Sequence, residues 1–231
     1  MEHFDTAVVL YLNDLLREHL WFAKLVNGLA LNPIVRGAPV LIPLMVIWFS
    51  RDQLAHRGRL LMGLFGVCIA TFLSVFLQKE LQVDIRPFFN PQLHLYLVEQ
   101  HHLSDWGRIN SFPSDTATLY FALSTVVFRE WRLGGMLAYI WSFVTAGICR
   151  AALGFHYPTD ILAGIALGIA TAYLFGNWQR LVLWVQRHLE RADGRTAWVH
   201  AALFIFLADA YSLFPGLQGF MRFFTFVGKK W

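Results

Sequence analysis

The segment CRAALGFHYPTD, residues 149–160, joins two apolar runs and carries an arginine, a histidine and an aspartate between them. Pro158 favours the first position of a helix and disfavours helix in the residue before it, so His156 is expected on a short loop. Asp160 then falls in the first turn of the next helix, where its carboxylate could accept the proton on one imidazole nitrogen. Such a pair orients a nucleophilic or basic histidine. Arg150 would clamp a phosphate or carboxylate beside it.

Taken alone, this segment also fits a purely structural explanation. Arg150 would end a helix, His156 would lie at an interface, and Asp160 would be favoured by the dipole at a helix N-terminus. Residues of these types are often structural, so the segment needs support from the rest of the chain.

The composition indicates a membrane protein. The chain has 231 residues, of which 57% are hydrophobic and 15% charged, whereas soluble domains are about half apolar and a quarter charged. The net charge of +4 could suggest nucleic acid, but the basic residues are spread among short loops between apolar runs, which fits orientation in a membrane better. We expect no nucleic-acid partner, and a single membrane domain over residues 1–231.

The apolar runs predict an all-α fold, a polytopic membrane helical bundle. Apolar residues recur at helical spacing over residues 6–27, while Asn13, Asp14 and Arg17 fill the other face, so an amphipathic N-terminal helix is expected at the interface. Gly63 and Gly66 would allow close helix contact. About six transmembrane helices are expected, over residues 33–50, 60–78, 114–128, 134–150, 158–175 and 196–214.

The distribution of basic residues predicts the orientation. Alternation of the spans groups loops 51–59, 129–133 and 177–195, which hold nine Lys and Arg, against loops 79–113 and 151–157, which hold three. The positive-inside rule makes the first group cytoplasmic. The protein is therefore expected in the cell (inner or plasma) membrane, with His156 on the extracytoplasmic face. The basic C-terminal tail and three basic residues near the N-terminus, Arg17, Lys24 and Arg36, argue the other way.

Two further clusters belong to the same face as His156. Lys79 and Arg86 are close to two helical turns apart, and they point the same way if the second span continues. Ser114 is a natural N-cap of the third span, and the free N–H groups of Asp115 and Thr116 would accept an anion. Singly, these clusters also fit interfacial snorkelling and plain helix capping. Together with the His156 segment they predict an anion site.

These residues form three spaced motifs. Lys79-x6-Arg86-Pro87, Pro113-Ser114-Asp115 and Arg150-x5-His156-x3-Asp160 resemble, in order and spacing, the signatures of the type 2 phosphatidic acid phosphatase superfamily. The resemblance covers a core of about residues 30–177, and the layout is similar to that of bacterial undecaprenyl diphosphate phosphatases.

The resemblance implies a membrane lipid phosphatase whose substrate is a polyprenyl or other lipid phosphate. His156 would attack phosphorus and become phosphorylated, and Asp160 would orient it. The phosphoryl oxygens would be held by Lys79, Arg86, Ser114 and Arg150, with Asp115 in the same motif. No metal and no cofactor are implied, because the cations neutralise the charge. The oligomeric state is not predicted.

One position departs from the family pattern. Thr116 stands where the family has a histidine that protonates the leaving oxygen, and such general acid catalysis contributes about 10²–10⁴-fold. An alkoxide leaving group has a conjugate acid that is about as weak as water, whereas the pKa of a departing phosphate is about 6. Thr116 is therefore expected to disfavour phosphate monoesters and to tolerate diphosphates.

Three functions remain open from the sequence. The first is hydrolysis of a lipid diphosphate through phospho-His156. The second is a transferase on the same scaffold, and the third is a non-catalytic relative that binds a lipid phosphate. Asp209, inside the sixth span, is an accessory candidate because carboxylates in apolar spans are costly. Candidate substitutes for the missing acid lie in the long polar loop: Glu99, His101, His102 and Asp105.

Overall fold

The structure is a computed structural model. It describes residues 2–50, 54–81, 83, 85–98, 110–191, 198–200, 202–203 and 205–206. These residues form helices and connecting loops, and no strand occurs among them. The main helices are α1 (Glu2–Glu18), α2 (Leu20–Leu31), α3 (Pro33–Ser50), α4 (Leu54–Glu80), α5 (Asp115–Glu130), α6 (Arg132–Ser142), α7 (Cys149–Ala152), α8 (Pro158–Asn177) and α9 (Gln179–Arg191). There are also two 3₁₀ turns, η1 (Pro87–Phe89) and η2 (Pro91–Leu93), and a π-helical stretch, η4 (Phe143–Ile148). Residues 198–200, 202–203 and 205–206 are helical as well.

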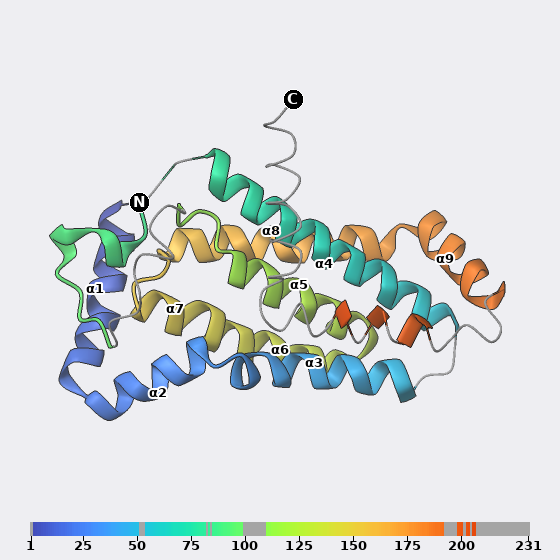
Figure 1. Ribbon diagram of the computed structural model, residues 1–231, viewed down its shortest axis with the longest axis horizontal. Helices are drawn as coiled ribbons and strands as arrows, with labels where there is room; N and C mark the ends of the chain where they lie inside the picture. Colours follow the sequence, from blue (N-terminus) through green and yellow to red (C-terminus); the bar gives the residue numbers. More distant parts are fainter. Residues whose placement is uncertain are drawn as a thin grey trace.

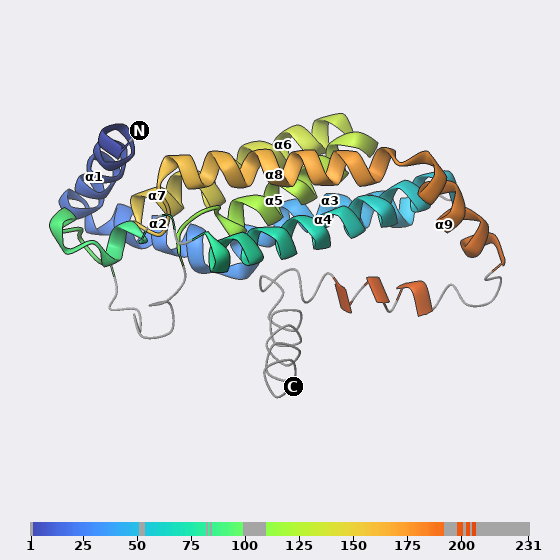
Figure 2. The same ribbon diagram turned by 90° about the horizontal axis from the view of Figure 1, so that it is seen from above.

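Among the described residues, four helical segments are long and apolar enough to cross a membrane. They are α3, His56–Glu80 of α4, the continuous helix Arg132–Ala152 made by α6, η4 and α7, and α8. These helices run along the long axis of the molecule (Figures 1 and 2). The chain is therefore a polytopic helical membrane bundle, as the sequence predicts. The sixth predicted span, 196–214, lies mainly outside the described residues.

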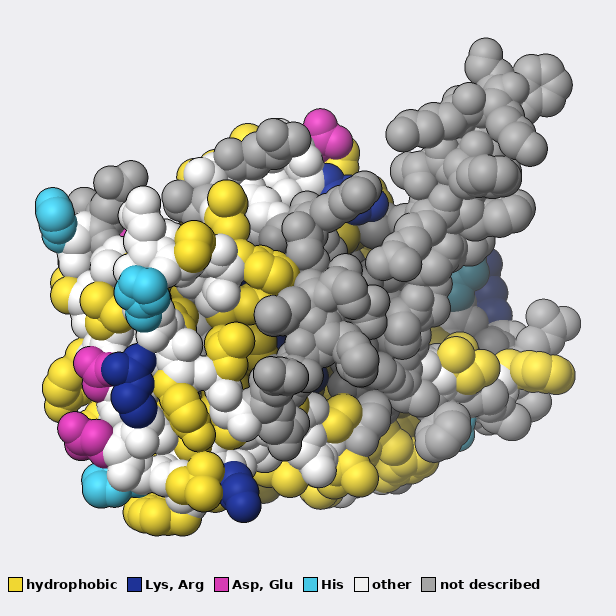
Figure 3. Space-filling view, turned by 60° about the vertical axis from the view of Figure 1, so that its left-hand side comes forward, with side chains coloured by type: hydrophobic (Ala, Val, Ile, Leu, Met, Phe, Trp, Pro, Cys, Tyr) yellow, Lys and Arg dark blue, Asp and Glu magenta, His cyan; other side chains and the backbone are white. Residues whose placement is uncertain are grey.

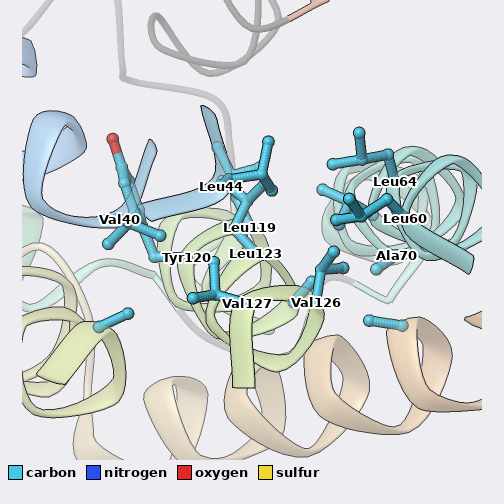
Figure 4. Packing of buried hydrophobic residues seen from close by; sticks show 14 of the residues in the cluster. Val40, Leu44, Leu60, Leu64, Ala70, Leu119, Tyr120, Leu123, Val126 and Val127 are labelled. Carbon is cyan, nitrogen blue, oxygen red and sulfur yellow. The ribbon is translucent and has the colours of Figure 1, made fainter. Parts of the chain in front are cut away.

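Helix α5 lies at the centre of the bundle and matches the third predicted span. It is only 16 residues long, and nearly all of its residues are buried by the surrounding helices. Figure 4 shows side chains of α3 and α4 converging on α5, where they form the largest apolar cluster. Because α5 is enclosed on several sides, its first residues are fixed relative to the segments around them.

Glycines bring α8 and α5 close together. A Cβ atom on Gly164 would lie 2.5 Å from the main-chain oxygen of Ser114, and one on Gly168 would lie 2.3 Å from that of Thr118. Small residues allow such close backbone approach between membrane helices. The predicted close contacts at Gly63 and Gly66 are also confirmed, since Cβ atoms there would lie 2.9 Å from Val126 and 3.0 Å from the oxygen of Thr171.

The N-terminal region differs from the prediction of one amphipathic helix over residues 6–27. The helix is interrupted at His19, whose backbone is extended, and α1 and α2 take different directions. Helix α1 crosses the end of the bundle, whereas α2 leads into α3 (Figures 1 and 2). The break lets residues of both helices pack on α7 and on the turn that follows it, which a straight helix could not do.

The ends of the bundle agree with the predicted alternation. Residues 79–98, the start of α5 and the turn before α8 lie at one end with α1 (Figure 1). The opposite end holds the α5–α6 connection, where the buried carboxylate of Glu130 accepts a hydrogen bond from Arg59 Nε at 2.9 Å and contacts His56. The region 177–195 contributes a helix there, α9. The His156 segment and the described part of the polar loop therefore lie at the same end of the bundle.

Candidate active site

His156 lies on the turn between α7 and α8, and its side chain has 0% exposure. Its Nδ1 atom lies 2.9 Å from the main-chain oxygen of Ser111. A carbonyl oxygen only accepts hydrogen bonds, so Nδ1 must carry the hydrogen. In the neutral ring, the lone pair is then on Nε2. The residue that sets this tautomer, Ser111, was not among the predicted site residues.

Two buried arginines converge on Nε2 of His156. The distance is 3.3 Å from Arg86 Nη1 and 3.4 Å from Arg150 Nη2. The side chains of Arg86 and Arg150 are 2% and 1% exposed. Arg86 also donates from Nη1 to the main-chain oxygen of Phe155 at 3.0 Å, and the guanidinium of Arg150 lies 4.7 Å from the centre of the Phe155 ring. The unprotonated nitrogen therefore faces two fixed positive charges.

The local backbone explains how Arg86 reaches the site. Helix α4 ends at Glu80, so the conditional prediction that Lys79 and Arg86 share a helix face does not apply. Arg86 is on the loop that follows, and this loop is fixed by a hydrogen bond of 2.9 Å from Phe88 N to Gly154 O. Gly154 has a φ of 71°, which favours glycine. A Cβ atom there would also lie 2.6 Å from the side chain of Leu95.

Asp160 lies in the first turn of α8, as predicted, but its carboxylate does not bind the imidazole in the predicted way. Its Oδ2 atom accepts a hydrogen bond of 2.8 Å from Tyr157 N and stands 4.0 Å from Nδ1 of His156. This distance is too long for a hydrogen bond, so the predicted Asp160–imidazole hydrogen bond is wrong in this structure. The carboxylate remains close enough to act on the ring electrostatically.

Ser114 caps α5, as the sequence predicts, because its Oγ atom accepts from Ala117 N at 3.3 Å. Its main-chain N–H donates to the main-chain oxygen of Asp160 at 3.0 Å. Gln78, beside Lys79, donates to the oxygen of Pro113 at 2.6 Å and so joins the end of α4 to this turn. No sequence pattern marks Gln78 as a site residue.

The carboxylate of Asp115 occupies the anion-binding end of α5. Its Oδ1 atom accepts from Thr116 N at 2.7 Å and from Thr116 Oγ1 at 3.3 Å, and it lies 3.8 Å from Nε2 of His156. The prediction of a free N–H group at Thr116 is therefore wrong, because this group donates to the side chain of Asp115. A phosphoryl group entering the site would meet this carboxylate as well as the two arginines.

Of the remaining predicted residues, the structure describes only Lys79. Lys79 lies on the last turn of α4 with its side chain exposed, unlike the buried arginines. Asp209 and the four candidate acids of the polar loop, Glu99, His101, His102 and Asp105, lie outside the described residues. Within the residues that the structure describes, no three His, Cys, Asp or Glu side chains are grouped closely enough to hold a metal ion.

The surroundings of His156 favour its neutral form. Burial lowers the pKa of the imidazole well below its ordinary value, and the charges of Arg86 and Arg150 lower it further. The hydrogen bond to Ser111 opposes this shift only in part. At neutral pH the ring therefore presents an unprotonated nitrogen, which is the form that acts as a nucleophile or base.

Comparison with known proteins gives relatives of similar length. The chain is 29% identical over 168 residues to the bacitracin transport permease protein BcrC of Bacillus licheniformis, covering 73% of this chain and 76% of the relative. It is 29% identical over 140 residues to undecaprenyl-diphosphatase BcrC of Bacillus subtilis, covering 60% and 67%. A lipid A 1-phosphatase of Rhizobium johnstonii is 35% identical over 81 residues, which cover 32% of each chain.

No solved structure matches the chain significantly. A family model described as the PAP2 superfamily matches residues 59–184, a range that includes the three motifs and leaves α1, α2 and α3 outside. Since this match spans more than half of the 231 residues, the chain belongs to the PAP2 superfamily.

Proposed function

We propose that the protein is a membrane lipid phosphatase that removes the terminal phosphate of a polyprenyl (undecaprenyl) diphosphate through a phosphohistidine at His156. The observation that carries this proposal is the convergence of Arg86 and Arg150 on the unprotonated Nε2 atom of a buried histidine. The names of the relatives support the substrate class, since one is an undecaprenyl-diphosphatase and another a lipid A 1-phosphatase.

In the first step, the lone pair on Nε2 of His156 attacks the terminal phosphorus of the diphosphate. The bond from this phosphorus to the bridging oxygen breaks, and the lipid monophosphate leaves with the electron pair. Arg86 and Arg150 bind the phosphoryl oxygens and stabilise the charge that they carry in the transition state. These arginines are buried and held in place, so little reorganisation is needed during the reaction.

Positive charge develops on the imidazole as the N–P bond forms. The Nδ1–H group continues to donate to Ser111, and the Asp160 carboxylate stands 4.0 Å from the same nitrogen. Both groups stabilise the cationic ring. A separation of 4.0 Å is short enough for Asp160 to stabilise the cationic ring, because electrostatic attraction acts over a longer distance than a hydrogen bond.

In the second step, water attacks the phosphorus of phospho-His156. The P–N bond breaks, its electron pair returns to Nε2, and inorganic phosphate leaves while the proton of the water passes to solvent. Thr116, buried at the start of α5, supplies no proton to a leaving group. A diphosphate substrate needs the least help, since its leaving phosphate has a pKa of about 6.

The site is proposed to face the extracytoplasmic side of the cell membrane. The support is the alternation of the predicted spans together with the nine Lys and Arg that the sequence has in loops 51–59, 129–133 and 177–195. A lipid substrate would then reach His156 from the outer leaflet, with its phosphates at the level of the turn between α7 and α8.

A phosphate-release screen tests the function. Purified protein is given lipid mono- and diphosphates, with and without candidate acceptor sugars, and His156→Ala is compared with the wild type. Phosphate release from a polyprenyl diphosphate by the wild type and its loss in His156→Ala are expected. The matched control is His188→Ala, which alters an exposed histidine of α9 at the other end of the bundle and should leave turnover unchanged.

Other outcomes of the screen reject the proposal in distinct ways. Turnover by a folded His156→Ala protein would exclude the phosphohistidine. Transfer to an acceptor without release of phosphate would identify a transferase, and binding of lipid phosphate without any turnover would identify a non-catalytic relative.

A further inference from the structure

We infer that α1 is a positioning element of the active site, in which Asn13 fixes the segment that carries Arg86 against the helix that carries Arg150. The inference rests on the proposed function for its catalytic consequence. It concerns a helix that lies outside residues 59–184, the part of the chain that matches the superfamily.

The side chain of Asn13 is almost fully buried, with 1% exposure, and it makes three hydrogen bonds to main-chain atoms. Its Oδ1 atom accepts from Tyr96 N at 2.7 Å, and its Nδ2 atom donates to Tyr96 O at 3.1 Å. Nδ2 also donates to Ala152 O at 2.9 Å. One amide therefore binds two segments that are 56 residues apart in the sequence.

These two segments are the ones that deliver the arginines. Tyr96 belongs to the loop 85–98, which contains Arg86, and Ala152 is two residues after Arg150 on α7. The side-chain amide of Asn13 makes hydrogen bonds that these main-chain groups would make to water in the unfolded chain. Because the site is buried, water cannot take the place of the amide. The separation of the two guanidinium groups at Nε2 of His156 thus depends on a side chain of α1.

A second anchor holds α1 to the start of α8. The buried carboxylate of Asp5 accepts from Thr159 N at 3.1 Å and from Thr159 Oγ1 at 2.8 Å. Thr159 directly precedes Asp160 in the first turn of α8, where a negative charge is favoured by the helix dipole. Asp5 therefore fixes the turn that places Asp160 beside His156.

A third contact is made at the far end of α1. Arg17 Nη2 donates to the main-chain oxygen of His94 at 2.8 Å, within the loop that carries Arg86. The residues buried on α1 are Asp5, Val9, Asn13 and Leu16, which recur at the spacing of one helix face. This face mixes polar and apolar residues because it binds main-chain groups of the site as well as apolar side chains.

The outer face of α1 suits the boundary between lipid and water. Phe4 and Tyr11 are exposed beside the charged residues Asp14 and Arg17, and the helix lies across the end of the bundle (Figures 1 and 2). In Figure 3, which brings this end of the molecule forward, acidic, basic and histidine side chains are interspersed with hydrophobic ones. A helix that lies in the membrane interface exposes both apolar and polar side chains, as α1 does.

The substitution Asn13→Asp tests the inference with little change in volume. It keeps the acceptor for Tyr96 N, removes both donated bonds, and sets a carboxylate against two carbonyl oxygens. Misplaced catalytic groups lower the stability of the transition state more than that of the bound substrate. We expect kcat to fall about tenfold or more, with KM changed less than about twofold. The matched control is Asp14→Asn on the exposed side of the same helix turn, which should leave both constants unchanged.

Vanadate binding provides a readout that does not depend on lipid turnover. Vanadate takes the five-coordinate geometry of phosphorus in transfer reactions, and its binding is measured from the increase in Tm with vanadate concentration. We expect about tenfold weaker binding to Asn13→Asp than to the wild type or Asp14→Asn. A lower Tm with unchanged vanadate affinity and unchanged kcat would show that Asn13 serves stability alone and would overturn the inference.

Asp5→Asn keeps the inference testable if Asn13→Asp fails to fold. It removes the charge at the second anchor and should produce the same split, with lower kcat and weaker vanadate binding at nearly constant KM. Unchanged values in a folded Asp5→Asn protein would count against the positioning role. A wild type that binds vanadate but releases no phosphate from lipids rejects the proposed function, whereas the comparison of vanadate affinities still decides the role of α1.

Discussion

The Nδ1 atom of His156 donates to the main-chain oxygen of Ser111 at 2.9 Å, and this bond leaves Nε2 facing Arg86 and Arg150. A main-chain carbonyl thus holds the tautomer that a carboxylate holds in a serine protease triad. The Asp160 carboxylate lies farther from the same nitrogen, with Oδ2 at 4.0 Å from Nδ1. Orientation and charge stabilisation of the histidine are therefore supplied by two different residues.

The protonation of His156 can be measured directly. Because burial and the two arginines lower its pKa below 6.5, the neutral ring should persist as the pH falls through 6.5 and should become protonated only at lower pH. We expect the NMR titration of the His156 ring to have a midpoint below 6.5, with the signal assigned by its loss in His156→Asn. The exposed His188 provides an internal comparison in the same spectra. A midpoint at or above 6.5 would contradict the surroundings described here.

The substitution Thr116→His tests the leaving-group argument. A histidine at this position could protonate the leaving oxygen, which is worth about 10²–10⁴-fold for a poor leaving group. Hydrolysis of lipid monophosphates should therefore rise more than hydrolysis of lipid diphosphates, measured as kcat/KM for both classes. Equal effects on the two substrate classes would remove the argument. Thr116→Val is the matched control, since it removes the hydroxyl without adding a proton donor.

Asp115→Asn tests whether the carboxylate at the start of α5 competes with phosphate. Its Oδ1 atom lies 3.8 Å from the nitrogen that would carry the phosphoryl group, and two negative groups at such distances repel each other. Loss of this charge should strengthen inhibition by inorganic phosphate by about tenfold, which corresponds to about 1.4 kcal/mol. The inhibition constant is measured beside that of Asp14→Asn, an exposed aspartate on α1. Unchanged or weaker inhibition by phosphate would show that Asp115 does not exclude anions.

Glu130 should matter for stability and not for chemistry. Its side chain is 4% exposed and binds Arg59 and His56 at the end of the bundle opposite to His156. Removing one partner of a buried pair leaves the other charge without compensation; since Arg59 is partly exposed, we expect Glu130→Ala to lower the free energy of unfolding by about 2 kcal/mol. Thermal unfolding in detergent checks this value. Turnover per folded molecule should remain that of the wild type, and a selective loss of kcat would contradict the assignment.

The order of the helices could be predicted from the sequence because it depends on local patterns. Apolar runs of sufficient length, broken by polar turns and prolines, define α3, α5 and α8 to within two residues of the predicted spans. Helix α4 begins at Leu54, six residues before the predicted span, so part of the predicted turn 51–59 is helical. The same holds for Ser114, whose capping of α5 follows from its place before an apolar run. Spaced motifs brought Arg86, Arg150 and His156 together as candidates, and the structure places their side chains in contact.

The remaining features depend on contacts between distant segments. The acceptor for His156 is a main-chain oxygen, which any residue at position 111 could supply, so no side-chain pattern marks it. Asn13 belongs by sequence to the polar face of an amphipathic helix, yet it is buried because α1 turns across the bundle and meets Tyr96 and Ala152. Local sequence patterns show which chemical groups are available and in which helices they occur. Helix packing sets which main-chain atoms face these groups, because hydrogen bonds between segments far apart in the chain exist only once the helices have packed.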